Sequence, residues 1–122
     1  MRMTQRKGDI AVAQAVATFT RLGFDVLLPL TESAAYDLVI EKDGRLIRVQ
    51  IRYAGTANGE VDLRRIHSNS KGYVIRKTKL GAYDWLYVLT GDGKEYISTS
   101  CLIDRRSVSI RSLRAISHIS DL

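Results

Sequence analysis

Three polar side chains in the middle of the chain have types and spacing that can do chemistry. Asp37 opens an apolar run, and Gln50 and Arg52 lie two residues apart on a second apolar run. A carboxylate accepts hydrogen bonds and binds cations, a carboxamide both donates and accepts, and a guanidinium binds anions. If these groups meet in space, they form a candidate site.

The stretch from Tyr36 to Tyr53 is predicted to bring these groups together as a β-hairpin. Asp43-Gly44 separates two apolar runs, and this dipeptide is a strong hairpin signal because Gly tolerates the positive φ of a primed turn. Asp37 then lies near the open end of the hairpin, close to Gln50. Side chains alternate along the second strand and give it two faces: Ile47, Val49, Ile51 and Tyr53 on one, and Leu46, Arg48, Gln50 and Arg52 on the other.

A purely structural explanation of the same residues stays open. Asp37 can be an ordinary acid that starts a strand after a turn, and Gln50 and Arg52 can be the solvent face of an amphipathic strand. The two explanations differ in whether the three side chains converge on one side of the sheet.

The segment before the hairpin predicts a helix and a short strand. Thr4 to Leu22 has the pattern of a helix that Gly23 ends. Its apolar stripe consists of Val12, Val16 and Phe19, with Ala13 and Ala17 beside them. Phe24 to Leu28 follows as a short apolar strand.

The segment after the hairpin predicts strands of unequal strength. Trp85 to Leu89 has the composition of a buried strand, and Gly91-Asp92-Gly93 turns it into Glu95 to Ser98. The weaker expectations are a strand at Glu60 to Ile66, a polar loop at His67 to Gly72, a short helix from Thr99 to Ile103, and an edge strand or subunit contact in the tail from Asp104 to Leu122. Together these elements predict one α/β domain over residues 1–122, with a helix packed on a mixed sheet built from hairpins.

The composition is that of a folded protein of the cytoplasm. The chain has 122 residues, of which 45% are hydrophobic and only one is proline, so a single modest core is expected. Its one cysteine, Cys101, excludes an internal disulfide and a multi-cysteine metal site, and a reducing compartment is the simplest location. No apolar run approaches the roughly 20 residues that span a bilayer, so no membrane partner is expected.

Positive charge is concentrated in one third of the sequence. The net charge is +6, and residues 44–79 hold nine basic residues against two acidic ones, a surplus of seven positive charges. A solvated surface is the ordinary explanation of such a surplus. Its concentration favours a polyanion as the partner, and nucleic acid is the most common one.

The motifs and their order resemble the PD-(D/E)XK nuclease superfamily. Three short segments carry the resemblance: Lys7-Gly8-Asp9-Ile10-Ala11, Tyr36-Asp37-Leu38-Val39 and Arg48-Val49-Gln50-Ile51-Arg52. The sequence is most similar to small homing endonucleases encoded by group I introns, whose third motif has Gln, and more distantly to archaeal Holliday-junction resolvases. The resemblance implies a restriction-endonuclease-like core and a metal-dependent endonuclease that hydrolyses double-stranded DNA.

The resemblance also implies roles for individual residues. Asp37 and Gln50 match the positions that hold Mg²⁺ or Mn²⁺, Arg52 occupies the lysine position, and Asp9 lies near the helix position where many relatives have Glu. The implied catalytic set is therefore Asp37, Gln50, Arg52 and Asp9. DNA contacts are expected from a basic and polar set: Arg48, Arg64, Arg65, Ser68, Asn69, Lys71, Arg76, Lys77 and Lys79. Cutting both strands of a duplex calls for two sites, which a homodimer or homotetramer supplies.

Two departures from the superfamily pattern support other functions. Val12 stands where many relatives carry the helix Glu, and Arg52 stands where they carry lysine. An arginine stays charged and cannot act as a base. The alternatives are a catalytically inactive DNA-binding descendant that acts as a regulator, and a nuclease selective for branched or damaged DNA.

Overall fold

The computed structural model of the chain describes residues 3–55, 59–63, 65–69, 72–76, 81–103 and 105–118. Within these residues the chain forms one α-helix, ten strands and two 3-10 helices. In chain order they are α1 (Met3–Arg21), β1 (Asp25–Leu27), β2 (Leu38–Lys42), β3 (Arg45–Ala54), β4 (Glu60–Asp62), β5 (Arg65–Asn69), β6 (Gly72–Arg76), β7 (Trp85–Thr90), β8 (Glu95–Ser98), β9 (Ser107–Ser109), η1 (Ile110–Ser112), β10 (Arg114–Ala115) and η2 (Ile116–His118).

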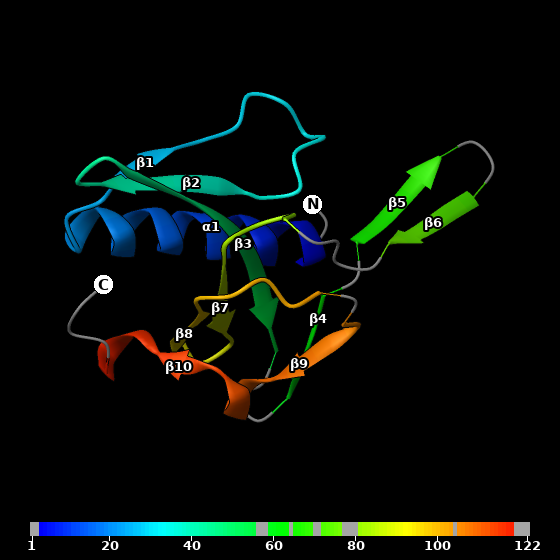
Figure 1. Ribbon diagram of the computed structural model, residues 1–122. Coiled ribbons are helices and arrows are strands. Elements are labelled where there is room, and N and C mark those ends of the chain that lie inside the picture. The colour runs from blue at the N-terminus through cyan, green and yellow to red at the C-terminus, as the bar shows by residue number, and fades with distance from the viewer. Residues whose placement is uncertain are drawn as a thin grey trace.

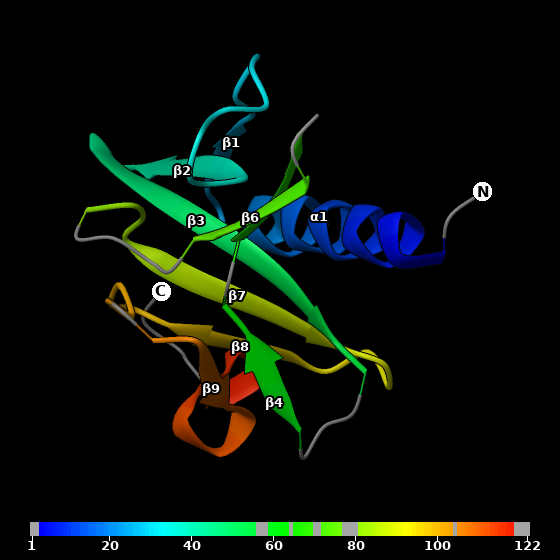
Figure 2. The ribbon, with the colours of Figure 1, turned by 90° about the vertical axis from the view of Figure 1, so that its right-hand side faces the viewer.

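Six of these strands form one mixed sheet in the order β1-β2-β3-β7-β8-β10. Its neighbours are antiparallel except β3 and β7, the two long central strands that lie side by side in Figure 2 and run parallel. The pairs β4–β9 and β5–β6 form two smaller antiparallel ribbons, and Figure 1 shows the β5–β6 ribbon projecting away from the main sheet. The predicted α/β fold, a helix on a mixed sheet built from hairpins, is confirmed.

The β2–β3 hairpin has the predicted turn. Asp43 and Gly44 have φ values of 53° and 80°, the left-handed pair that a type I′ turn requires. Gly adopts this conformation without steric cost, and Asp is among the residues that tolerate it. The turn fixes a register in which Leu38 pairs with Val49, so Asp37 enters the hairpin opposite Gln50.

β3 separates two apolar cores, and its alternation is confirmed. Its odd-numbered residues Ile47, Val49 and Ile51 are buried on the side that α1 covers, together with Trp85 and Tyr87 of β7. Its other face meets a second core, which contains Ala54, Leu86, Val88, Val61, Val108 and Ile110. Between Leu46 and Ala54 this second face carries the polar side chains of β3.

The buried stripe of α1 is turned relative to the sequence prediction. Ala11, Ala15 and Phe19 have no exposed surface, and Val12 and Val16 pack at the margin of the same core. The two alanines that were expected to lie beside the stripe, Ala13 and Ala17, are exposed, so this part of the prediction is wrong. The methyl groups of Ala11 and Ala15 let the helix approach the sheet closely, while the larger valines fit at its edge.

A carboxylate ties α1 to the centre of the sheet. The hydroxyls of Thr18 and Tyr87 each donate a hydrogen bond of 2.6 Å to Oε2 of Glu95. Burial and the neighbouring Glu95 raise the pKa of the Tyr87 phenol far above its ordinary value of 10.0. A buried hydroxyl without a partner is costly, so the helix is favoured in the one position where both hydroxyls reach Glu95.

The second half of the chain differs from its weaker sequence expectations. The strand expected at Glu60 to Ile66 is divided between β4 and β5, and the polar loop expected at His67 to Gly72 is wrong because both of its ends lie in the β5–β6 ribbon. The segment Thr99 to Ile103 contains no helix, and its Leu102 N–H donates to the Tyr83 hydroxyl over 3.2 Å. In the tail the predicted edge strand is confirmed as β10, which pairs with β8.

The turn after β7 leaves no room for a side chain at Gly91. A Cβ placed there would lie 2.7 Å from the carbonyl oxygen of Gly55 and 3.3 Å from the Tyr53 hydroxyl. We therefore expect Gly91→Ala to lower the free energy of unfolding by about 1–3 kcal/mol, as overpacking does elsewhere. Urea denaturation measures this loss.

A matched control for this substitution exists on α1. Gly8 has nothing within 4 Å of an added Cβ, so Gly8→Ala should stabilise the protein by about 0.5–1 kcal/mol through helix propensity. Equal midpoints for Gly91→Ala and the wild type would contradict the close approach.

Candidate active site

Asp37 uses its side chain to complete the ladder of β3. Its backbone N–H donates to the Val49 carbonyl over 2.9 Å, and its Oδ2 accepts the Ile51 N–H over 2.7 Å. The carboxylate thus replaces the backbone acceptor that a longer β2 would offer. Both hydrogen bonds described for this carboxylate end on Oδ2, so Oδ1 accepts neither of them.

Gln50 meets Asp37 directly. Its Nε2 donates a hydrogen bond of 3.1 Å to Oδ2 of Asp37, although Gln50 is only 7% exposed. An ionised carboxylate can only accept, so the atom that touches it must be the amide nitrogen, and Oε1 is the atom left to face a cation. The structure therefore brings the predicted acid and amide together on the face of β3 opposite α1.

Arg52 lies on the same face, and its described hydrogen bonds end on backbone carbonyls. Its Nε donates to the Asp62 carbonyl over 3.2 Å and its Nη1 donates to the Ile51 carbonyl over 2.9 Å. The guanidinium is therefore held between β3 and β4. It places a fixed positive charge two residues along the strand from Gln50.

Asp9 lies on α1, outside the hairpin. It is exposed on α1, and the helical positions that face the sheet are those of Ala11 and Ala15. Asp9 comes seven residues before Val16 and so projects in nearly the same direction as that residue, at the exposed margin of the helix–sheet contact. Val12, where relatives carry the helix acid, packs against the core.

The basic and polar residues expected to contact DNA lie in three different places. Four of them belong to the β5–β6 ribbon, where Arg65 pairs with Arg76 and where Ser68 and Asn69 end β5. Four others lie outside the described residues: Arg64, Lys71, Lys77 and Lys79. Arg48 lies on β3 and is engaged by the acid described next.

Sequence reasoning missed Asp84, which precedes β7 as Asp37 precedes β2. Its Oδ2 accepts the Arg48 backbone N–H over 2.9 Å and the Arg48 Nε over 3.2 Å, and its Oδ1 lies 3.2 Å from Nη2. Nη1 of the same guanidinium donates to the Gly81 carbonyl over 2.6 Å. The available signal was an acid directly before a buried strand, but nothing local indicates that β7 lies beside β3.

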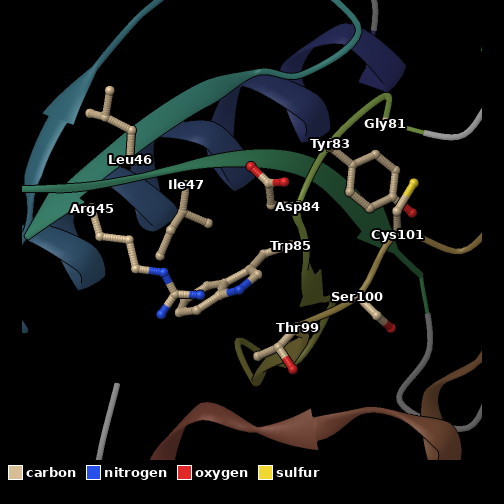
Figure 3. Close-up of a pocket in the computed structure, with 10 residues that line it drawn as sticks. All are labelled: Arg45, Leu46, Ile47, Gly81, Tyr83, Asp84, Trp85, Thr99, Ser100 and Cys101. Carbon is tan, nitrogen blue, oxygen red and sulfur yellow. The ribbon is translucent and has the colours of Figure 1, made fainter.

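A pocket of about 450 Å³ opens next to this ion pair. Figure 3 shows its lining, with Arg45 and Leu46 at the start of β3, Asp84 and Trp85 at the start of β7, and Thr99 to Cys101 from the segment after β8. The pocket admits water to the pair, whose side chains are 38% and 43% exposed. Solvent therefore screens the interaction between Arg48 and Asp84.

Comparison with known proteins identifies the family. A family model described as PD-(D/E)XK endonuclease matches residues 2–105, which is most of the chain. The chain belongs to the PD-(D/E)XK endonuclease family. The sequence-based resemblance to this superfamily is confirmed.

A solved structure agrees with membership of the PD-(D/E)XK endonuclease family. The structure of a bacterial homing endonuclease, I-Ssp6803I, matches with a TM-score of 0.76 and 25% sequence identity, over 88% of this chain and 78% of the other. No curated protein matches the chain significantly. Together the family and the structural neighbour support a nuclease. In the described part of the chain, no helix is long and apolar enough to cross a membrane.

The donor atoms at the hairpin fit a magnesium-type cation of the kind that PD-(D/E)XK endonucleases generally use. Mg²⁺ prefers oxygen ligands and is commonly held by one or two carboxylates plus substrate phosphates. Oδ1 of Asp37 and Oε1 of Gln50 are two oxygens that could serve as such ligands. Among the described residues no group of three or more His, Cys, Asp or Glu side chains comes together, so a soft-metal cage is not formed there.

The Arg48–Asp84 pair predicts an acid-sensitive contribution to stability. Hydrogen bonding from Arg48 holds the pKa of the Asp84 carboxyl below its ordinary value of 3.8, and Arg45 adds a smaller effect of the same sign. Because the folded pKa is depressed, this stabilisation is present above the unfolded pKa and is lost as pH falls through the folded one. With both side chains more than a third exposed, it should not exceed about 1 kcal/mol.

Urea unfolding of the wild type and Asp84→Asn at two pH values tests this contribution. The difference between their unfolding free energies should be largest near pH 7 and should shrink as the pH falls below the ordinary carboxyl pKa of 3.8 and the carboxylate takes up a proton. A difference that is the same at both pH values would contradict an electrostatic origin.

Proposed function

We propose that the chain is a metal-dependent endonuclease that hydrolyses phosphodiester bonds of double-stranded DNA, in the manner of a homing endonuclease. The hydrogen bond between Gln50 and Asp37 carries the proposal, because it aligns the carboxylate and the amide that the sequence resemblance implies as metal ligands. Family membership and the homing-endonuclease neighbour support the reaction class.

The residues of the hairpin would hold a divalent cation and orient the substrate. When bound, such a cation lowers the pKa of a water and offsets charge on the leaving oxygen. The two N–H donors on Oδ2 of Asp37 fix the orientation of its carboxylate, so that Oδ1 and the Gln50 carbonyl oxygen present a rigid edge. Arg52 adds a permanent positive charge that attracts a phosphate, and it cannot take up a proton in the reaction.

The β5–β6 ribbon is proposed as the element that contacts DNA. A two-stranded β-ribbon fits the major groove, and this ribbon projects away from the main sheet in Figure 1. Arg65 and Arg76 are register partners within it, and Ser68 and Asn69 lie toward its tip. Arg64, Lys71, Lys77 and Lys79 belong to the same basic stretch of the sequence and would add phosphate contacts.

We further propose that residues 1–122 act as one domain within a two-fold homodimer or a homotetramer. One chain with one site cuts one strand, and symmetry supplies the second site for the other strand. Light scattering after size exclusion, with and without a DNA duplex, measures the mass. A monomer in both conditions would contradict this arrangement.

A plasmid-nicking assay with Mg²⁺ or Mn²⁺ tests the proposed activity, with EDTA as the control. Conversion of supercoiled plasmid to nicked or linear DNA only with metal supports the proposal. Tight, salt-sensitive binding of duplex DNA without any cleavage would instead indicate an inactive DNA-binding descendant. The hydrogen bonds from Arg52 to two backbone carbonyls favour this alternative. Cleavage of branched DNA but not linear DNA at equal salt would favour a junction nuclease.

A further inference from the structure

Two aspartates hold β3 from opposite sides around Gln50. Asp37 accepts the N–H of Ile51 on the β2 side, and Asp84 accepts the N–H of Arg48 on the β7 side. Each acid stands directly before its strand and uses a carboxylate oxygen where the strand itself would offer a carbonyl. Gln50 lies between the two bonded amides, so its backbone is fixed from both edges.

Asp84 binds Arg48 through both backbone and side chain. The Arg48 carbonyl accepts the Asp84 N–H over 2.9 Å, while the Arg48 N–H and guanidinium donate to the Asp84 carboxylate. With Nη1 on the Gly81 carbonyl, all three guanidinium nitrogens of Arg48 have partners in the protein. These bonds use three of the five guanidinium N–H donors and hold the group against Asp84 and Gly81, which leaves fewer donors for a phosphate.

We propose that Asp84 and Arg48 form a positioning pair, which fixes the segment of β3 that carries Gln50 and so keeps Gln50 aligned with Asp37. Neither residue touches the reacting atoms. The inference rests on the proposed function for its effect on cleavage, and it replaces a direct contact between Arg48 and DNA. Outer-shell partners of this kind matter because a displacement of a ligand by a fraction of an ångström weakens metal binding and the reaction.

The chain offers a matched control at the other end of β7. Asp92 follows β7 as Asp84 precedes it, and it accepts a hydrogen bond from the Thr90 hydroxyl and pairs with Lys94 at 3.9 Å. Its side chain is 49% exposed, close to the 43% of Asp84. Asp92→Ala therefore removes a comparable end contact of β7 without touching the segment that carries Gln50.

Single-turnover cleavage by four variants at saturating DNA tests the pair: Arg48→Met, Asp84→Ala, the double variant and Asp92→Ala. We expect about a 10- to 100-fold loss of rate in each single variant of the pair, because outer-shell partners typically have effects of this size. The double variant should lose no more than either single one, since the two residues act as a unit. Asp92→Ala should cleave like the wild type even where its stability is reduced.

Three outcomes would overturn the inference. A loss in Asp92→Ala that equals the loss in Asp84→Ala would show a general effect of stability. A direct phosphate contact would be shown if Arg48→Met weakened DNA binding measured without metal, while Asp84→Ala had no effect on it. The slope of log binding constant against log salt concentration would then fall by about one in Arg48→Met. Additive losses in the double variant would show two independent roles.

A readout that needs no cleavage separates this inference from the proposed function. The side-chain NH₂ signals of Gln50, assigned by their absence in Gln50→Leu, report the hydrogen bond to Asp37 in ¹⁵N NMR spectra. Shifted signals in Asp84→Ala but not in Asp92→Ala support the positioning role even if the wild type cleaves nothing, in which case the nuclease proposal alone fails. Unchanged signals and an unchanged rate in Asp84→Ala, with active wild type, would refute the pair and leave the nuclease proposal intact.

Discussion

Asp37→Asn is expected to reduce metal-dependent cleavage by about 100-fold or more, since loss of a ligand should exceed the 10- to 100-fold effect of losing an outer-shell partner. Asparagine keeps an oxygen that can accept the N–H of Ile51, so the hairpin should still form. What disappears is the negative charge that would hold the cation. Single-turnover cleavage over a range of Mn²⁺ concentrations measures the loss, and high Mn²⁺ should restore part of the rate.

Asp25→Asn is the matched control for this prediction. Asp25 is an exposed acid at the start of β1, in the same sheet, and it pairs with Glu41 rather than with a residue of the candidate site. Its substitution removes one negative charge from the protein and should leave the rate unchanged. Cleavage by Asp37→Asn within about twofold of the wild type, or an equal loss in Asp25→Asn, would exclude Asp37 as the essential carboxylate.

Phe19→Ala is expected to have the largest effect on stability, a loss of about 3–5 kcal/mol in the free energy of unfolding. The Phe19 ring is fully buried and contacts the rings of Phe24 and Tyr87 at centroid distances of 5.8 and 5.9 Å. Its removal leaves a cavity between α1 and the sheet that the rigid aromatic neighbours cannot fill. Because domains of this size are typically stable by only about 5–15 kcal/mol, urea unfolding should show a much lower midpoint.

Two further variants keep this prediction testable if the alanine variant does not fold. Phe19→Leu retains most of the apolar volume and should lose clearly less than Phe19→Ala. Ile10→Ala removes a residue that is 48% exposed on the same helix, and its effect should stay within about 0.5 kcal/mol. Equal midpoints for Phe19→Ala and Ile10→Ala would mean that the helix is not anchored by this ring.

The sequence was most informative where structure is set by local chemistry. The Asp43-Gly44 turn requires positive φ at both residues, and its geometry fixes which residues of β2 and β3 face each other. The strict alternation of β3 then placed Gln50 on the face opposite Val49. The meeting of Asp37 and Gln50 could be predicted for these reasons, whereas their roles in a reaction remain predictions.

The errors arose where the outcome depends on packing partners far along the chain. Helical periodicity alone could not decide whether Ala11 and Ala15 or Ala13 and Ala17 face the sheet, because all four are small and apolar. Asp84 was missed because the parallel pairing of β3 with β7 has no local signature. Parallel neighbours are joined by a long crossover, and here Val49 meets Trp85.

The β5–β6 ribbon was missed for a different reason. A run such as His67 to Gly72 has the composition of a loop, and polar side chains are depleted in strands. An antiparallel ribbon that projects from the fold can nevertheless use them, because its two strands pair with each other, here from Arg65 and Arg76 to Asn69 and Gly72. Composition therefore underestimates strands that do not join a core.

The separation of contacting residues also implies an order of events during folding. The Asp37–Gln50 contact closes a loop of 13 residues, and hairpins of this kind form in about 1–10 μs. The Arg48–Asp84 contact joins residues 36 positions apart, so it must await the slower closure that sets the folding rate of sheets with distant partners. A newly synthesised chain would thus bring its acid and amide together early and acquire their rigid support last.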